Sequence, residues 1–145
     1  MSSRYLLDTN ILSHMMRDID GTASRKFREV ASDERAHAIY TSVVVDCELQ
    51  FGLSRKPNER LSRAYERIIT AVDVLALDEK IVPHYALLRT ALEAAGTPIG
   101  PNDALIAAHA LALDAILVSA DTEFERIPGL KVENWLAAQP SGALA

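Results

Sequence analysis

The sequence predicts an α/β protein in which a parallel sheet carries helices on both faces. Short apolar segments typical of strands alternate with longer segments of helical periodicity along the chain. The segment 4–8 is a short apolar run that ends in an acid, and 115–118 is continuously apolar; both are typical of buried strands. Parallel sheets bind ligands beyond the carboxyl ends of their strands, so the polar residues at those ends are the first candidates for a functional site.

In the first half of the chain, capping residues and helix breakers mark the expected boundaries. Thr9 or Asn10 can cap a helix after the first strand, and Gly21 breaks that helix. Ser42 and Asn58 are good N-caps because their side-chain oxygens can accept free amide hydrogens of a first helical turn. The expected order is strand 4–8, a helix ending before residue 20, helix 23–30, strand 38–41, helix 43–53 and helix 59–71.

In the second half, Asp78 is expected to cap a long helix that Gly96 closes. Pro83 falls near the first turn of that helix, where proline is tolerated. After a turn-rich segment, Asn102 or Asp103 can cap the next helix. The expected order is strand 72–77, helix 79–95, loop 97–101, helix 104–113, strand 115–118, loop 119–126 and strand 130–133. Residues 1–138 are expected to form a single domain, with a flexible C-terminal tail over 139–145.

Composition narrows the class of protein further. The 145 residues are 49% hydrophobic, which suits one folded domain with a substantial core. A single cysteine, Cys47, excludes an internal disulfide and a cysteine-based zinc site, and it is expected in the core. The longest apolar stretch, 104–113, is too short for a membrane span of about 20 residues, and no secretory leader is evident. We therefore expect a cytoplasmic protein with no membrane association.

The net charge of −5 disfavours unassisted binding to nucleic acid, which relies on positive surface. Two basic patches nevertheless stand out. Each has two interpretations, an ordinary solvated helix face or a surface that faces a charged substrate, and the sequence does not decide between them. The patches consist of Arg25, Lys26 and Arg28, and of Arg55, Lys56, Arg60, Arg63 and Arg67.

Three aspartates lie at the ends or starts of expected elements. Asp8 ends the first strand, Asp103 opens a helix, and Asp121 follows the strand over 115–118, with Glu123 as a nearby alternative. Each has an ordinary structural explanation, because Asp is a common helix cap and turn residue. Taken singly, these explanations are favoured for Asp8 and Asp103.

Glu48 is harder to explain by local structure. Helical spacing groups it with Val44, Phe51 and Gly52 in an apolar stripe, while Asp46 falls on another, exposed face. No basic residue lies within four positions of Glu48, so a buried carboxylate here lacks a local partner. Carboxylates crowded together without bases favour a hard cation such as Mg²⁺ or Mn²⁺.

Other catalytic machinery is not evident. The histidines His14, His37, His84 and His109 show no paired ligand spacing, and His109 is expected to be a packed or surface residue. No glycine-rich phosphate loop and no Gly-x-Ser-x-Gly elbow is present. A metal-dependent reaction on a phosphodiester is the chemistry that four acids of this kind can support.

Five ordered blocks of the sequence resemble the PIN-domain ribonucleases, with the VapC-type toxins of bacterial type II toxin–antitoxin pairs as the most similar group. The resemblance runs from about residue 5 to Trp135 and is most specific around Asp103. The blocks are Leu6-Leu7-Asp8-Thr9-Asn10, Glu48-Leu49-Gln50-Phe51-Gly52, 99–110 (IGPNDALIAAHA), Leu117-Val118-Ser119-Ala120-Asp121 and 124–130 (FERIPGL).

The resemblance implies a three-layer α/β/α domain and Mg²⁺- or Mn²⁺-dependent endonuclease action on RNA, such as a transfer RNA. It implies that Asp8, Glu48 and Asp103 are the three core catalytic and metal-binding acids, with Asp121 as the fourth. Thr9, Asn10 and Ser119 take supporting positions. It also implies a cognate antitoxin that neutralises the toxin, and a homodimer. Arg55, Lys56, Arg60 and Arg63 are the candidate RNA-binding residues.

Two other functions remain as alternatives. A phosphatase of the haloacid dehalogenase type also has an Asp after its first strand, but it requires a second Asp two residues later, where this chain has Asn10. A PIN-like module that binds RNA or protein without cleavage would be expected to lack one of the core acids, and all of them are present.

Overall fold

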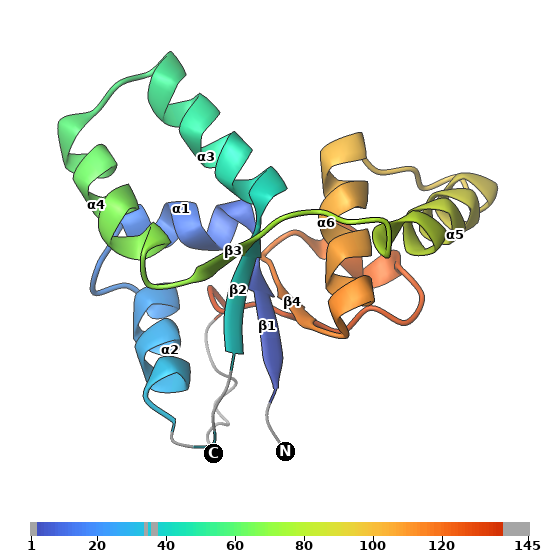
Figure 1. Cartoon of the computed structure of the whole chain (residues 1–145), viewed down its shortest axis with the longest axis horizontal. Coiled ribbons are helices and arrows are strands. Elements are labelled where there is room, and N and C mark those ends of the chain that lie inside the picture. Colours follow the sequence, from blue (N-terminus) through green and yellow to red (C-terminus); the bar gives the residue numbers. More distant parts are fainter. Residues whose placement is uncertain (1–2, 34, 36–37, 138–145) are drawn as a thin grey trace.

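A five-stranded sheet forms the centre of the molecule (Figure 1). The computed structural model describes residues 3–33, 35 and 38–137, so the expected tail over 139–145 lies outside the described residues. All four neighbouring strand pairs are parallel, which confirms the predicted sheet. The strands, in their spatial order, are β3 (Asp73–Leu75), β2 (Ala38–Ser42), β1 (Arg4–Leu7), β4 (Ile116–Val118) and β5 (Val132–Glu133).

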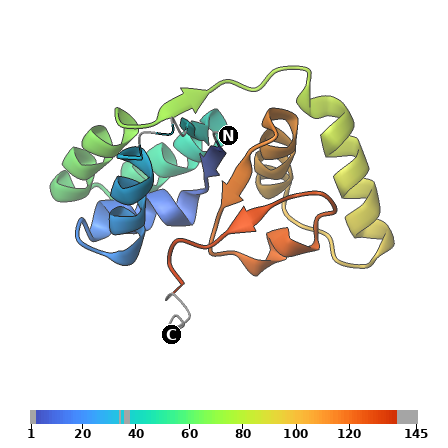
Figure 2. The same cartoon turned by 90° about the horizontal axis from the view of Figure 1, so that it is seen from below.

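Helices cover both faces of the sheet and give the predicted three layers. Figures 1 and 2 show α1, α2 and α4 on one side and α5 and α6 on the other, while α3 rises from the carboxyl end of β2. Among the residues described, no helix combines the length and apolar character needed to cross a membrane. The helices are α1 (Thr9–Arg17), α2 (Thr22–Ala31), α3 (Val43–Arg55), α4 (Glu59–Ile69), α5 (Ile81–Ala94), α6 (Pro101–Leu113) and the short 3-10 helix η1 (Thr122–Arg126).

The core lies between these layers, and its composition explains the apolar strand segments. Leu6 and Leu7 of β1 and Leu117 of β4 are completely buried. Helix α1 buries Ile11 and helix α6 buries Ile106, so apolar residues from both helical layers join the core. Strands with helices over both faces have no solvent-facing side, which is why alternation of polar and apolar residues is absent from β1.

Several of the expected helix boundaries are confirmed by hydrogen bonds. The Ser42 hydroxyl accepts from the Val44 amide at 3.1 Å, and the Asn58 side chain accepts from the Leu61 amide at 2.9 Å. Gly96 follows α5 with a φ of +75°. This left-handed conformation, which glycine adopts without steric cost, ends α5 as expected.

Three other boundary predictions are wrong. Helix α1 begins at Thr9, so its N-cap is not Thr9 or Asn10 but Asp8, which confirms the capping role favoured for Asp8 taken singly. Helix α6 begins at Pro101 with Gly100 as its N-cap, because proline is well suited to the first helical position. Neither Asn102 nor Asp103 therefore caps α6. The carboxylate of Asp78 accepts from the Lys80 amide in a turn before α5 instead of capping that helix.

The winding of the sheet reverses between β1 and β4. The chain proceeds from β1 to β2 and β3 on one side, and β4 and β5 are then added on the other side. The carboxyl ends of β1 and β4 are joined by a hydrogen bond from the Asp8 amide to the Val118 carbonyl, at 2.9 Å. On the other side of β1, the fully buried Thr41 hydroxyl donates to the Leu7 carbonyl at 2.7 Å. This reversal point is where doubly wound sheets place their ligands.

Candidate active site

Asp8 lies at the reversal point and is almost completely buried, with 4% of its surface exposed. Its Oδ1 accepts from the Thr9 amide at 2.8 Å, and its Oδ2 accepts from the Ser119 hydroxyl at 2.7 Å. Burial is the largest influence on its pKa and raises it, and the hydrogen bonds from Ser119 and Thr9 oppose that shift. Nearby Glu48 and Asp121 raise the pKa further because like charges disfavour ionisation.

Glu48 reaches the same region from the middle of α3. Its side chain is half-buried, and its Oε1 accepts from the Thr9 hydroxyl at 2.5 Å. Thr9 therefore connects the first turn of α1 with α3, through its amide to Asp8 and its hydroxyl to Glu48. The apolar stripe predicted around Glu48 is only partly correct, because Val44 is buried while Phe51 is 64% exposed.

Asp103 comes from the other helical layer, in the first turn of α6. Its side chain is half-buried, and no described side chain or backbone amide donates a hydrogen bond to its carboxylate. Burial, followed by the charges of Asp8, Asp121, Glu48 and Glu123, raises its pKa to about 6. Every one of these influences disfavours the charged form, so this carboxylate lacks a compensating partner among the residues that the structure describes.

Asp121 and Glu123 complete the acidic group from the segment that follows β4. Oxygen atoms of Asp103, Asp121 and Glu123, one from each residue, lie within 4.8 Å of one another. Asp121 also caps η1, because its Oδ1 accepts from the Glu123 amide at 2.9 Å. The structure thus brings both candidates for the fourth acid beside Asp103, whereas the sequence left them as alternatives.

Asn10 and Ser119 form a polar scaffold beneath the acids. The Ser119 hydroxyl donates to Asp8 and accepts from the Asp121 amide at 3.0 Å. The Asn10 side chain accepts from the Ala120 amide at 3.0 Å and donates to both Asp8 and Ser119 at 3.3 Å. These contacts hold the carboxyl end of β4 against the start of α1, so the Ser119 hydroxyl is hydrogen-bonded to both Asp8 and Asp121.

No basic residue in the described part of the chain forms an ion pair with the acidic group. Within the described ranges, the ion pairs are local contacts at the surface, and none includes an acid of the candidate site. The charges of Asp8, Glu48, Asp121 and Glu123 all act on Asp103, so five carboxylates from four segments lie near one another without a described cation beside them. Buried and half-buried carboxylates in this arrangement provide the oxygen ligands that Mg²⁺ and Mn²⁺ prefer.

The basic residues predicted to bind RNA lie at the end of α3 and along α4, away from the acids. All four are exposed; two of them contact a residue of their own helix, and a third contacts the end of α1. Arg55 lies over the Phe51 ring at 5.5 Å, Arg60 donates to the Arg17 carbonyl at 3.2 Å, and Arg63 pairs with Glu59 at 3.4 Å. Lys56 ends α3 as its C-cap.

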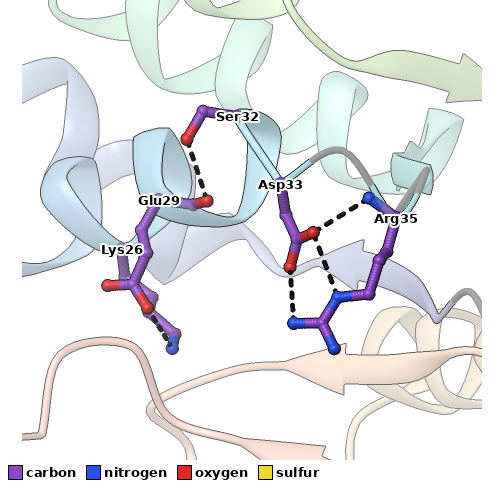
Figure 3. Close-up of polar contacts among 5 residues, drawn as sticks. All are labelled: Lys26, Glu29, Ser32, Asp33 and Arg35. Carbon is purple, nitrogen blue, oxygen red and sulfur yellow. Dashed lines mark hydrogen bonds and ion pairs between the residues drawn. The ribbon is translucent and has the colours of Figure 1, made fainter.

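The other basic patch, formed by Arg25, Lys26 and Arg28 on α2, also makes local contacts. Lys26 pairs with Glu29 at 3.4 Å, and Figure 3 shows this pair beside the contacts between Asp33 and Arg35. Arg28 donates to the Ile19 carbonyl at 2.9 Å. The ordinary interpretation, a solvated helix face, accounts for this patch.

The sequence prediction missed three features around the site. Cys47 is exposed, not part of the core, because α3 leaves the sheet and buries only one side. Asp46 is half-buried and accepts from the Tyr65 hydroxyl at 2.5 Å, so it joins α3 to α4. His109 is buried and contacts Ser42, and apart from the capping role of Ser42 no local pattern indicates this pairing.

Comparison with known proteins gives a consistent result. The family model described as "PIN domain" matches residues 5–130. "Ribonuclease VapC2" of Rickettsia felis is 35% identical over 133 residues, covering 90% of this chain and 97% of the relative. The "tRNA(fMet)-specific endonuclease VapC" of Shigella flexneri is 31% identical over 135 residues, covering 91% of this chain and 98% of the relative.

A solved structure extends the similarity to three dimensions. The crystal structure of VapBC2 from Rickettsia felis bound to a DNA fragment from its promoter contains a chain with a TM-score of 0.83 and 34% identity. The alignment covers 91% of this chain and 98% of that one. A matching family model over most of the chain, two relatives above 30% identity and a shared fold lead to one conclusion. The chain belongs to the PIN-domain family, within its VapC group of ribonucleases.

Proposed function

We propose that this chain is a divalent-metal-dependent endoribonuclease, the toxin of a toxin–antitoxin pair. The observation that carries the proposal is the convergence of Asp8, Glu48, Asp103, Asp121 and Glu123 without a basic partner among the described residues. Membership of the VapC group supports the ribonuclease activity, since the matched relatives are named as a ribonuclease and a tRNA endonuclease. The acids then act as a metal site, not as general acids or bases paired with a histidine.

We assign Asp8, Glu48, Asp103 and Asp121 as the ligands of Mg²⁺ or Mn²⁺, with Glu123 as a fifth ligand. A bound ion of this type lowers the pKa of water and stabilises negative charge on a phosphodiester under attack. The protein's own residues hold the carboxylates in place. Thr9 holds one oxygen of Glu48 by a hydrogen bond, and Ser119 and Asn10 hold Asp8. The Asp103 carboxylate, which receives no hydrogen bond from the described residues, is free to bind the ion.

The substrate we propose is a structured cellular RNA, with a transfer RNA as the leading candidate. The Shigella flexneri relative, named for action on tRNA(fMet), supports this choice. Exposed Arg55, Lys56 and Arg63 offer positive charge for the phosphate backbone on a protein whose net charge is −5. Action on such RNA implies a cytoplasmic location.

We also propose that a cognate antitoxin neutralises the protein and that the free toxin is a homodimer. The antitoxin proposal rests on the neighbouring structure, which is described as a VapBC complex. The homodimer rests on resemblance to the VapC-type toxins. Sedimentation of the antitoxin-free protein tests the dimer, and a monomer at micromolar concentration would contradict it.

The central experiment is cleavage of total cellular RNA by purified protein, with Mg²⁺, with Mn²⁺ and with EDTA. Discrete fragments that require metal, and that are absent with the Asp8→Asn variant, are the expected result. Sequencing the fragment ends identifies the substrate. A folded, antitoxin-free protein that binds Mn²⁺ but yields no fragments would contradict cleavage and favour a binding module, and a gel of the preparation reveals any co-purified antitoxin.

A further inference from the structure

A buried hydrogen bond joins the two helices that carry Glu48 and Asp103. His109 of α6 is 3% exposed, and its Nδ1 lies 2.9 Å from the Oγ of Ser42, which is completely buried. Ser42 is the last residue of β2 and the N-cap of α3. The contact spans 67 residues of sequence, so it is a tertiary link and not part of local helix structure.

The direction of this link follows from the buried Ser42 hydroxyl hydrogen, because the distance alone allows either group to donate. The Ser42 oxygen already accepts from the Val44 amide at 3.1 Å. The Ser42 hydroxyl hydrogen is buried and needs an acceptor, and His109 Nδ1 is the acceptor that the described residues provide. His109 is therefore neutral, with its proton on Nε2. Burial lowers the His109 pKa, which agrees with a neutral ring, although the charge of Asp78 opposes this shift.

The link lies at the same distance along the helix from both acids. Glu48 follows Ser42 by six residues on α3, and Asp103 precedes His109 by six residues on α6. At 1.5 Å per residue, each acid is about 9 Å along its helix from the link. Figure 1 shows α3 leaning away from α6 as it leaves the sheet, so the two helices diverge from the end at which α3 begins, where Ser42 is the N-cap.

This arrangement makes the site sensitive to the angle between α3 and α6. With an arm of about 9 Å, a tilt of roughly 10° at Ser42 would move the Glu48 Cα by about 1.6 Å. Metal sites require their ligands within a few tenths of an ångström of the correct position. The helices do pack against each other, but apolar contacts permit sliding and tilting that a directional hydrogen bond restricts.

We propose that His109 is a positioning residue, which sets the separation of Glu48 and Asp103 by accepting a hydrogen bond from Ser42. The inference rests on the proposed metal-dependent function and deepens it. His109 contacts neither the metal nor the RNA in this proposal. Its contribution is to hold α6 at a fixed angle to the start of α3.

Two amide variants of His109 provide a matched test. In His109→Asn, the side-chain oxygen can occupy the position of Nδ1 and accept from Ser42. In His109→Gln, the longer side chain carries its amide toward the position of Nε2, so the acceptor is misplaced. A third variant, His109→Leu, removes the acceptor and keeps an apolar side chain of similar size.

The measurement is the dissociation constant for Mn²⁺, by calorimetry or by electron paramagnetic resonance, on antitoxin-free protein without RNA. Couplings transmitted through a structure amount to about 2- to 30-fold in affinity. We expect Mn²⁺ to bind about three- to tenfold more weakly to the Gln and Leu variants and within about twofold of wild type to the Asn variant. Thermal unfolding in EDTA is measured in parallel. If the variants acted only by destabilising the fold, the Asn variant would not be expected to retain wild-type Mn²⁺ affinity.

The link is also tested by a double-mutant cycle with Ser42→Ala. If the link acts through this pair, the Gln substitution adds little to the loss of Mn²⁺ affinity in the Ser42→Ala background. Unchanged Mn²⁺ affinity in both the Gln and Leu variants would overturn the inference while the metal site stands. Equal losses in the Asn and Gln variants would also overturn it. Failure of the wild type to bind Mn²⁺ would instead overturn the proposed metal site, and the inference with it.

Discussion

The hydroxyl of Thr9 donates to Oε1 of Glu48 at 2.5 Å and thereby ties the first turn of α1 to the middle of α3. The same residue donates its amide to Asp8. One threonine thus orients two carboxylates that come from different layers of the molecule. Its position directly after Asp8 is what allows both contacts, because the amide and the hydroxyl diverge at the start of the helix.

Removal of this hydroxyl is expected to weaken metal binding. Thr9→Val keeps the shape of the side chain but leaves Glu48 without its donor, and changes to such outer contacts reduce metal affinity by about tenfold or more. Thr9→Ser retains the hydroxyl and serves as the control. Titration with Mn²⁺ measures both, and equal affinities for the Val and Ser variants would show that Thr9 does not orient Glu48.

Asp8 has two separable functions, as an acid and as a helix cap. We expect Asp8→Asn and Asp8→Ala each to reduce RNA cleavage by at least about a hundredfold, since each removes a charged ligand of the proposed metal site. Asn remains a good N-cap for α1, whereas Ala costs about 1 kcal/mol of stability. Cleavage assays and urea unfolding distinguish the two effects, and substantial cleavage by the Asn variant would contradict the assigned ligand set.

The pKa of Asp103 makes the stability of the metal-free protein depend on pH. Its folded value of about 6 exceeds the usual value of 3.8, so between these values the folded state binds more protons than the unfolded state. The stability that Asp103 contributes is therefore present near pH 4 and is lost as the pH rises through about 6. In EDTA, we expect Asp103→Asn to raise Tm by about 2–4 °C at pH 7.5 and by much less at pH 4.

That difference between the two pH values is the informative measurement. An Asp103→Asn variant with the same Tm advantage at pH 4 and pH 7.5 would show that the effect is not electrostatic. In wild type, Mn²⁺ should reverse the loss, because the ion compensates the clustered negative charge and competes with protons for the carboxylates.

Asp121 and Glu123 are both expected to bind the ion. Asp121→Asn preserves the cap of η1 and removes the charge, and Glu123→Gln removes the charge of its neighbour. Each should weaken Mn²⁺ binding by about tenfold. Exposed Glu125 lies in the same 3-10 helix outside the cluster, so Glu125→Gln is the matched control. A loss in only one of the two cluster variants identifies the single residue that binds.

The basic residues of α4 are expected to contribute charge to RNA binding. Reversal of Arg63 should weaken RNA binding and reduce its dependence on salt, since one phosphate contact is lost. Arg60→Glu has the same expected effect but also removes the cap on the Arg17 carbonyl, so its thermal stability must be compared. Lys131→Glu, an exposed change beside β5, is the control. Unchanged binding by the Arg63 variant would assign this patch to the ordinary surface.

Local rules predicted most of the fold because they concern neighbours in sequence. The apolar strands and the caps at Ser42 and Asn58 depend on residues a few positions apart, and these predictions are confirmed. The start of α6 was misplaced because Pro101 and Asp103 both suit a helix N-terminus, and the proline determined the outcome. The preference of proline for the first helical position is a local rule that favours the observed start.

The positions of the site residues were predictable only in part. Parallel strands bring Asp8 and Ser119 together at the reversal point, as the strand pattern indicated. The contacts of Thr9 with Glu48 and of Ser42 with His109 depend on how α3 leaves the sheet, which no periodicity specifies. For the same reason, Phe51 and Cys47 were expected to be buried but are exposed.

The exposed thiol of Cys47 has a practical consequence. The chain contains no other cysteine, and Cys47 directly precedes Glu48 in α3. A maleimide fluorophore or nitroxide will therefore label one defined position beside the acids. Mn²⁺ is paramagnetic, so its binding will quench or broaden the signal of such a probe in a distance-dependent way, whereas Mg²⁺ will not. A single label on the native sequence is thus enough to measure the distance between Cys47 and the bound Mn²⁺.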